Sequence, residues 1–123
     1  WRLSAESDAG EIIGYVILML TLTPPDWEPI RYADYGYVLD GDRDCILAPC
    51  IADAWQGSGL GSHMLAAVIA AAKAARRRYM LLLGGTQVRN ARAVHFYAKH
   101  GFVPLGLFEH PVGVTNQDML LVL

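Results

Sequence analysis

One short stretch, residues 51–62, limits the possible folds of this chain more than any other. It reads I-A-D-A-W-Q-G-S-G-L-G-S, in which an apolar strand ends in a glycine-rich turn and a helix begins directly afterwards. Gly57, Gly59 and Gly61 leave their backbone N–H groups uncovered, and the first N–H groups of a helix have no partner inside it. The helix dipole adds partial positive charge at the same end. The stretch therefore predicts a strand–turn–helix unit that binds an anion, most plausibly a phosphate or pyrophosphate.

The remaining pattern predicts a mixed α/β domain. Alternating or continuous apolar residues indicate strands over 1–6, 11–23, 44–52, 79–83, 102–108 and 117–123, and apolar residues at helical spacing indicate helices over 59–77 and 90–100. Residues 24–44 are expected to be irregular, with 35–39 as a candidate to pair with the next strand through a turn at Asp40-Gly41. Pro49 lacks a ladder donor, so its strand should lie at an edge, carry a bulge or splay from its neighbour.

Length and charge point to one domain with an uneven surface. The 123 residues suit a single domain over 1–123 that needs no disulfide or metal to hold its core. Residues 1–53 carry ten acids and three bases, whereas residues 54–123 carry two acids and seven bases, for a net charge of −2. The basic half contains the glycine turn and suits a polyanionic ligand. The acidic half either attracts a cationic partner such as an amine or is ordinary surface charge.

Composition argues against several other classes. The longest apolar runs, 15–20 and 64–72, are shorter than the ~20 residues of a membrane-spanning helix, so we expect no membrane partner and a cytoplasmic location. Cys45 and Cys50 are five apart on one predicted strand, which places them on opposite faces and argues against a disulfide between them. Neither a zinc spacing nor a complete calcium loop occurs, so no metal is expected. The basic residues show no aromatic interleaving, so no nucleic-acid partner is expected.

Two nucleotide-binding motifs fit the glycine turn poorly. A P-loop needs a Lys after its glycines, and none follows Gly61. A dinucleotide fingerprint needs the spacing G-x-G-x-x-G and an acid at the end of the next strand, whereas this turn reads G-x-G-x-G and that strand ends in Leu83-Gly84-Gly85. A nucleotide-binding regulatory domain is therefore the weakest of the functional hypotheses.

The turn resembles instead the acyl-CoA loop of the GNAT N-acetyltransferase superfamily. Gln56-x-x-Gly59-x-Gly61 after an apolar strand is similar to the family pattern Arg/Gln-x-x-Gly-x-Gly/Ala. Farther along, residues 90–102, N-A-R-A-V-H-F-Y-A-K-H-G-F, resemble the family helix N-x-x-A-x-x-x-Y-x-x-x-G-F. The resemblance covers about residues 45–123 and implies an α/β (α+β) fold, with a mixed, mostly antiparallel central sheet, flanking helices and one splayed strand.

The resemblance also implies an activity and a set of binding residues. It implies an acetyl-CoA-dependent acyltransferase that transfers an acetyl group to a primary amine by direct attack in a ternary complex. Acetyl-CoA is the cosubstrate implied, and the acceptor is a small amine or a protein amine. The cofactor-binding residues implied are Ile51, Ala52, Gln56, Gly57, Ser58, Gly59, Leu60, Gly61, Ser62, Asn90, Ala93 and Tyr97. Helix capping alone is an alternative role for Asn90, and core packing alone is an alternative role for Tyr97.

Tyr97 carries the implied acid chemistry. A phenol within hydrogen-bond reach can protonate the thiolate that leaves when the amine attacks. A backbone N–H near Ile51 is a candidate to stabilise negative charge on the carbonyl oxygen. The base that deprotonates the amine is not fixed by the sequence; Asp44 is the catalytic candidate we carry forward, and the alternatives are a water chain, Asp42, Glu109 and His110.

The chain departs from the family pattern at its start. Family members usually begin with a strand and two helices that roof the acceptor site, whereas this chain enters a strand pattern at Trp1. We expect either that the sequence begins within a longer domain, or that a partner subunit covers the exposed sheet, which favours a homodimer. The second functional hypothesis is accordingly a non-catalytic acyl-CoA-binding or interaction module that keeps the cofactor site.

Overall fold

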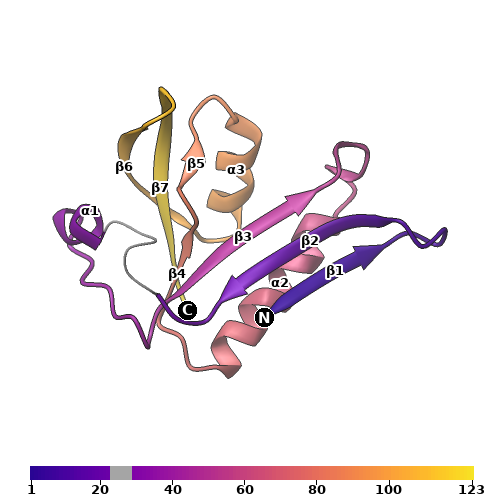
Figure 1. The fold of residues 1–123 in the computed structure, drawn as a ribbon, viewed down its shortest axis with the longest axis horizontal. Coiled ribbons are helices and arrows are strands. Elements are labelled where there is room, and N and C mark those ends of the chain that lie inside the picture. The colour runs from indigo at the N-terminus through magenta and orange to yellow at the C-terminus, as the bar shows by residue number, and fades with distance from the viewer. Residues whose placement is uncertain (23–28) are drawn as a thin grey trace.

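The computed structural model describes residues 1–22 and 29–123, which form the elements shown in Figure 1. Each of the six predicted strands and both predicted helices is present, with ends moved by a few residues. The strands are β1 (Arg2–Glu6), β2 (Ile12–Met19), β3 (Cys45–Ile51), β4 (Tyr79–Leu82), β5 (Thr86–Gln87), β6 (Val103–His110) and β7 (Val114–Val122). The helices are α1 (Pro29–Asp34), the 3₁₀ turn η1 (Asp53–Trp55), α2 (Leu60–Ala74) and α3 (Ala91–Lys99).

The described strands belong to one sheet. Its order is β1-β2-β3-β4-β7-β5, and β6 also pairs with β7. The pairing of β3 with β4 is parallel, with α2 as the crossover between them, and the other pairings are antiparallel. The mixed, mostly antiparallel sheet predicted from the sequence is therefore confirmed.

Strands β3 and β4 separate part-way along β3. They pair only over residues 45–47, whereas the pairing of β3 with β2 continues to Ile51. Leu83 donates one last backbone bond to the carbonyl of Leu47 at 3.0 Å, and beyond it the two halves of the sheet diverge as a V (Figure 1). Pro49 lies in the diverging half, where its missing N–H removes no bond to β4. Of the three situations predicted for Pro49, the splayed strand is the one found.

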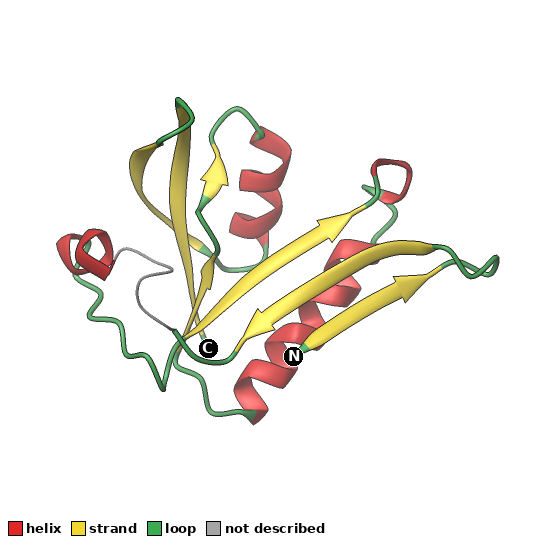
Figure 2. Cartoon of the chain, in the orientation of Figure 1, coloured by secondary structure: helices red, strands yellow, loops and turns green. Residues whose placement is uncertain are grey.

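Helices cover both faces of the sheet. On one face, α2 and α3 pack over the larger core, which includes Leu47 and Val68. On the other face, α1 packs over a smaller cluster, which includes Tyr32 and Ile46. Figure 2 shows α2 behind β1–β3, and α1 beside β6 and β7, away from α2. Ile46 and Leu47 are neighbours in β3, so their side chains point to opposite faces and belong to different clusters.

The segment before β3 differs from the prediction. Residues 29–34 form a helix, and residues 35–39 form no strand. The N–H groups of Tyr35 and Tyr37 bond back to carbonyls of the helix, and Gly36, with φ of +87°, ends it. Tyrosine rings of this segment pack on the sheet instead; Tyr37, for example, meets Tyr79 edge-on at 5.5 Å between centroids. Residues 23–28, which include the predicted end of the strand over 11–23, lie outside the described residues.

Three smaller observations complete the fold. The two-residue strand β5 was not predicted, because so short a strand has no measurable period. Cys45 is buried, Cys50 is exposed and both are free thiols, as their odd separation predicted. Within the described part of the chain, no helix is both long and apolar enough to cross a membrane.

Candidate active site

The glycine turn presents a group of unpaired amides. Gly57 and Gly59 have φ of +82° and +91°, in the left-handed region that glycine adopts without a Cβ penalty, and Gly59 is the N-cap residue of α2. Among the described residues, no backbone acceptor lies within hydrogen-bond range of the N–H groups of Gly57, Gly59, Gly61 and Ser62. The turn therefore presents unpaired amides at the start of α2, and anion binding by them stays a prediction.

Other predicted loop residues have internal partners. The Ser58 N–H donates to the Trp55 carbonyl, and the Leu60 N–H donates to the Ser58 hydroxyl, both at the long distance of 3.4 Å. The Ala52 N–H donates to the Ile13 carbonyl at 3.0 Å, so it is committed to the sheet. Ser58, Leu60 and Ala52 are thus better placed to shape the turn than to donate to a ligand.

The side chain of Gln56 fastens the turn to the end of β3. Its Nε2 donates to the Ile51 carbonyl at 3.1 Å and to Asp53 Oδ1 at 2.8 Å. These two bonds occupy the amide donors of Gln56, although the residue still borders the cavity described next. The side chain of Gln56 therefore holds the glycine turn in place, since both of its amide hydrogens are used within the protein.

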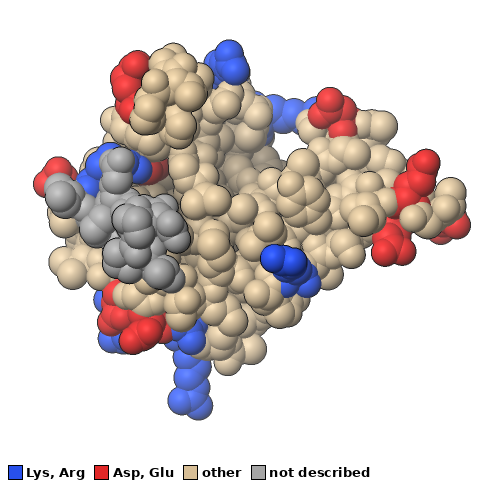
Figure 3. Space-filling model, in the orientation of Figure 1, with Lys and Arg blue, Asp and Glu red and all other residues tan. Residues whose placement is uncertain are grey.

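A cavity of about 440 Å³ fills the V between the diverging half of β3 and α3. Figure 3 shows the surface hollowed at this place, between the two arms of the molecule. Nine of the predicted cofactor-binding residues line the cavity: Ile51, Gln56, Gly57, Gly59, Gly61, Ser62, Asn90, Ala93 and Tyr97. The other lining residues are Val16, Leu47, Pro49, Met64, Leu65, Arg92, His95, Phe96 and Lys99. The fold therefore brings both sequence motifs to one space.

The charges around this cavity favour an anion. Arg92 and Lys99 line it, and no carboxylate occurs among its described lining residues. A Cβ atom at Gly57 would lie 2.7 Å from Nη2 of Arg92, so the guanidinium leans over the glycine turn. At Gly61 a Cβ atom would lie 3.4 Å from the Phe96 ring, at van der Waals contact, so α2 approaches α3 closely there.

The splayed edge of β3 adds one directed donor. Successive N–H groups in a strand point to opposite sides. Since the Ala52 N–H points to β2, the Ile51 N–H points away from β2, toward the side from which β4 has diverged. Pro49, two residues earlier, presents only a carbonyl on that side. The amide of Ile51 is thus available to a carbonyl group bound in the V.

Asn90 and Tyr97 reach the cavity from α3. The Asn90 Oδ1 caps the helix by accepting from the Ala93 N–H at 3.1 Å, so the capping role is present and the Ala93 amide is occupied. The Tyr97 ring packs edge-on against Phe96 and Phe102, each at 5.3 Å between centroids. Burial raises the pKa of Tyr97 to about 12. The phenol therefore stays protonated at neutral pH and can donate a hydrogen bond into the cavity.

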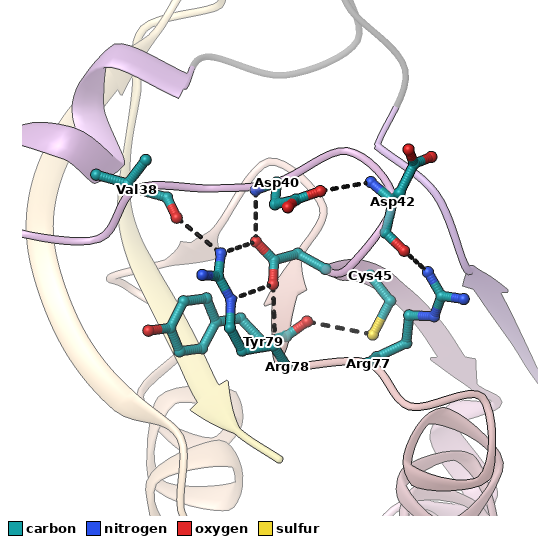
Figure 4. Close-up of polar contacts among 8 residues, drawn as sticks. Val38, Asp40, Asp42, Cys45, Arg77, Arg78 and Tyr79 are labelled. Carbon is teal, nitrogen blue, oxygen red and sulfur yellow. Dashed lines mark hydrogen bonds and ion pairs between the residues drawn. The ribbon is translucent and has the colours of Figure 1, made fainter.

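Asp44 lies at the opposite end of β3 from the glycine turn. It is fully buried and bonds to Arg78 at 3.1 and 2.8 Å, and it accepts from the backbone N–H groups of Asp40 and Tyr79 (Figure 4). The Asp42 backbone belongs to the same network. Asp44 therefore fastens the loop before β3 to the start of β4, and its position does not suit the role of catalytic base.

Two of the alternative bases lie elsewhere. Glu109 and His110, at the end of β6, line a second cavity of about 260 Å³ on the face that α1 covers. This cavity also contains Ile46 and Leu82, whereas Leu47 lines the first cavity. The structure thus brings Tyr97 together with the glycine turn, but it places Glu109 and His110 in the cavity on the other face of the sheet.

The chain matches a protein-family model over most of its length. The model of the acetyltransferase (GNAT) domain matches residues 3–104, which is most of the chain. The chain belongs to the GNAT acetyltransferase family. Its class is accordingly that of an acetyl-CoA-dependent N-acetyltransferase. A search of curated proteins finds no match.

Solved GNAT structures share the fold. An acetyltransferase of the GNAT family from Streptococcus pneumoniae aligns with a TM-score of 0.77 and 26% identity, over 99% of this chain and 65% of that one. A ribosomal-protein-alanine N-acetyltransferase from Brucella melitensis gives 0.75 and 22%, over 99% and 68%. A Salmonella typhimurium structure described as an acetyltransferase with its cofactor acetyl-CoA gives 0.70 and 20%, over 98% and 63%. The chain therefore spans about two thirds of the length of these GNAT proteins.

Sequence reasoning missed the charged face of α3. Arg92, His95 and Lys99 line the cavity, but none of them was predicted to bind the cofactor. A signal was present, because residues 92, 95, 96 and 99 recur at helical spacing and must share one face of the helix. The family motif names residues 90, 93 and 97 of this helix, and it leaves residues 92, 95 and 99 unspecified.

Proposed function

We propose that the chain transfers an acetyl group from acetyl-CoA to a primary amine, by direct attack while both substrates are bound. The observation that carries the proposal is one cavity lined both by the unpaired amides of the glycine turn and by Tyr97. The turn suits a pyrophosphate, and Tyr97 suits a leaving group that needs a hydrogen-bond donor. Direct attack is supported by the absence of a cysteine among the described residues that line this cavity.

The cavity suits coenzyme A in charge and in shape. The N–H groups of Gly57, Gly59, Gly61 and Ser62 would hold the pyrophosphate, and the guanidinium of Arg92 leans over the same turn. The amide of Asn90 would hold the pantetheine arm along the splayed strand. A residue larger than glycine at position 61 would narrow the cavity where α2 meets α3.

Ile51 and Tyr97 would each assist one part of the acetyl transfer. Acetyl-CoA supplies an activated thioester, in which a C–S bond is exchanged for the C–N bond of the amide product. The Ile51 N–H would stabilise negative charge on the carbonyl oxygen. The hydroxyl of Tyr97 would donate to the departing sulfur. The amine proton would go to water or to Glu109 or His110, because Asp44 is held in its network with Arg78.

A calorimetric titration with acetyl-CoA tests the proposal. Gly59→Asp places a carboxylate in the glycine turn, and the Coulomb cost near a pyrophosphate should weaken acetyl-CoA binding by roughly two orders of magnitude. Gly10→Asp is the matched control, because Gly10 has a similar φ of +79°, an equally open Cβ position and a place in the distant β1–β2 turn. Equal affinity in both variants, or no binding by the unaltered chain, would overturn the proposal. The expected homodimer and cytoplasmic location stay predictions.

A further inference from the structure

The two halves of the sheet part beside a bulge in the strand that runs through β4 and β5. Leu81 pairs with Leu120 in the β4–β7 ladder, and Thr86 pairs with Gln117 in the β5–β7 ladder. Between these two pairs lie four residues of the β4–β5 strand and only two of β7, so the strand has two residues in excess. A bulge bends the strand that contains it, whereas β3 keeps an unbroken register with β2 over residues 46–51. The divergence of the sheet therefore originates in the β4–β5 strand.

Gly84 and Gly85 form this bulge. They have φ of +67° and +69°, in the left-handed region, and they follow directly after Leu83, whose N–H makes the last described backbone bond to β3. A Cβ atom at Gly85 would lie 2.7 Å from the carbonyl oxygen of Gln117, whereas a Cβ atom at Gly84 would meet nothing within 4 Å. The absence of a side chain at Gly85 therefore lets the bulge lie directly against β7.

A buried side chain of β7 holds the bulge in place. Asn116 is 8% exposed, and its Nδ2 donates to the carbonyl of Gly84 at 2.7 Å. Its Oδ1 is buried and has no partner among the described residues. A buried acceptor without a donor costs free energy, which an apolar side chain of similar size would avoid. Asn116 is therefore not the most stabilising residue for this position, and its distinct contribution is the bond to Gly84.

The bulge determines where one wall of the first cavity stands. Directly after the bulge, Gln87 of β5 pairs with Asn116, and the Gln87 carbonyl accepts from the N–H of Asn90, the N-cap of α3, at 2.9 Å. Helix α3 carries Tyr97 and lines this cavity together with β3. Figure 1 shows β5, β7 and α3 on one arm of the V and β3 on the other. A shift of the bulge would therefore move Asn90 and Tyr97 relative to β3.

We propose that Asn116 is a positioning residue for the first cavity: by holding Gly84 against β7, it keeps the V open at the width that coenzyme A needs. The inference rests on the proposed function, in which coenzyme A occupies this cavity. Asn116 is not among the described residues that line the cavity, so it acts through the bulge and α3. Without its bond, the chain would have the binding geometry for only part of the time. The dissociation constant for coenzyme A would then rise by the inverse of that fraction.

Asn116→Leu tests this role, since it removes the donor and nearly keeps the size of the side chain. In calorimetric titrations of the full chain, the dissociation constant for coenzyme A should rise about tenfold, as for a binding geometry populated about a tenth of the time. The free energy of unfolding in urea should not fall, because the unpartnered Oδ1 is removed as well. Gln117→Met is the matched control. It also replaces an amide by an apolar group, but on the opposite face of β7, and should leave the affinity unchanged.

Two glycine variants test the bulge itself. Gly84→Ala and Gly85→Ala impose similar backbone strain, because the two residues have nearly equal positive φ. Only Gly85→Ala places a Cβ atom against the carbonyl of Gln117 and pushes the bulge away from β7. The dissociation constant for coenzyme A should therefore be about tenfold higher in Gly85→Ala than in Gly84→Ala.

Amide hydrogen exchange gives a readout that needs no cofactor. The N–H of Leu83 bonds to the carbonyl of Leu47 at the apex of the V, at 3.0 Å. In Asn116→Leu this amide should exchange about tenfold faster, while the amide of Met80, within β4, keeps its rate. A faster exchange at both amides would indicate a general loss of stability and would contradict the positioning role.

Three results would overturn the inference. The first is an unchanged affinity for coenzyme A in Asn116→Leu, whatever the exchange rate at Leu83. The second is a marked loss of stability in the same variant, which would make Asn116 a residue that only stabilises the fold. The third is equal affinity in Gly84→Ala and Gly85→Ala. If the unaltered chain bound no coenzyme A, the proposed function would fail instead, and exchange at Leu83 would still show whether Asn116 holds the bulge.

Discussion

Replacing Tyr97 with Phe tests the chemistry with the least disturbance of the fold. The substitution removes one oxygen and keeps the ring that packs against Phe96 and Phe102. Because no described residue is hydrogen-bonded to the Tyr97 hydroxyl, the substitution breaks no hydrogen bond among the described residues. We therefore expect kcat to fall, while the KM for acetyl-CoA and the free energy of unfolding stay nearly constant.

The size of the effect follows from the pKa. A phenol with a pKa of about 12 is a much weaker acid than a thiol, whose usual pKa is ~8.5, so complete proton transfer to the sulfur costs about 5 kcal/mol. Tyr97 should therefore act by hydrogen bonding to the departing sulfur. A hydrogen bond to a charged group contributes about 1.5–3 kcal/mol, which corresponds to a loss of roughly tenfold to 150-fold in kcat.

The assay is steady-state release of the coenzyme A thiol, followed with a disulfide reagent, and Tyr15→Phe on the exposed face of β2 serves as the control. The raised pKa also predicts that ionisation of Tyr97 causes no loss of kcat between pH 7 and 10. Since the folded pKa lies above the unfolded value of ~10, the stability contributed by Tyr97 is present below pH 10 and is lost as the pH rises toward 12. If the kcat of the Tyr97→Phe variant stayed within twofold of that of the unaltered chain, Tyr97 would have a packing role and no role in the chemistry.

Three further predictions address the cofactor turn, the structural network and the thiols. Arg92→Gln should weaken acetyl-CoA binding about tenfold and reduce its salt dependence, whereas Arg89→Gln, an exposed change outside the cavity lining, should do neither in titrations at two salt concentrations. Asp44→Asn should lower the free energy of unfolding in urea by about 3 kcal/mol, because it removes the buried negative charge that pairs with Arg78. A loss below about 0.5 kcal/mol would show that this ion pair does not stabilise the fold. Cys50 should react with a thiol reagent at pH 8 in the folded chain, while Cys45, whose pKa burial raises to about 12, should react only after unfolding; two reactive thiols in the folded chain would disprove the assignment.

Local signals predicted most of the elements, because they depend on neighbours in the chain. The apolar run before Gly57 was enough to predict β3, and the apolar residues at helical spacing after Gly59 were enough to predict α2. Asn90 predicted the start of α3, and its Oδ1 does cap that helix. Residues 35–39 were wrongly expected to pair with the next strand; they form no strand, and Tyr35, Tyr37 and Leu39 pack on the sheet, a contact that the local sequence does not specify.

The candidate site was predicted in part. The glycine turn and Tyr97 were identified from two motifs, but the motifs do not reveal which amides have partners. Ala52 has its N–H in the β2–β3 ladder, and Ile51 next to it does not, a difference that register alone decides. Asp44 was carried forward as a candidate base although the sequence identified none, and the seven-residue strand β3 separates it from the glycine turn.

The sequence by itself determined the strand–turn–helix unit, the cap of α3 and the family, since each depends on residue types at fixed short spacings. Only the tertiary structure decided that Asp44 pairs with Arg78, that Asp118 holds α1 over the sheet, and that cavities form on both faces of β3. These features depend on contacts between residues 34 to 87 positions apart, such as Arg31 with Asp118. No local pattern specifies them, because burial and pairing are set by how the strands assemble into the sheet.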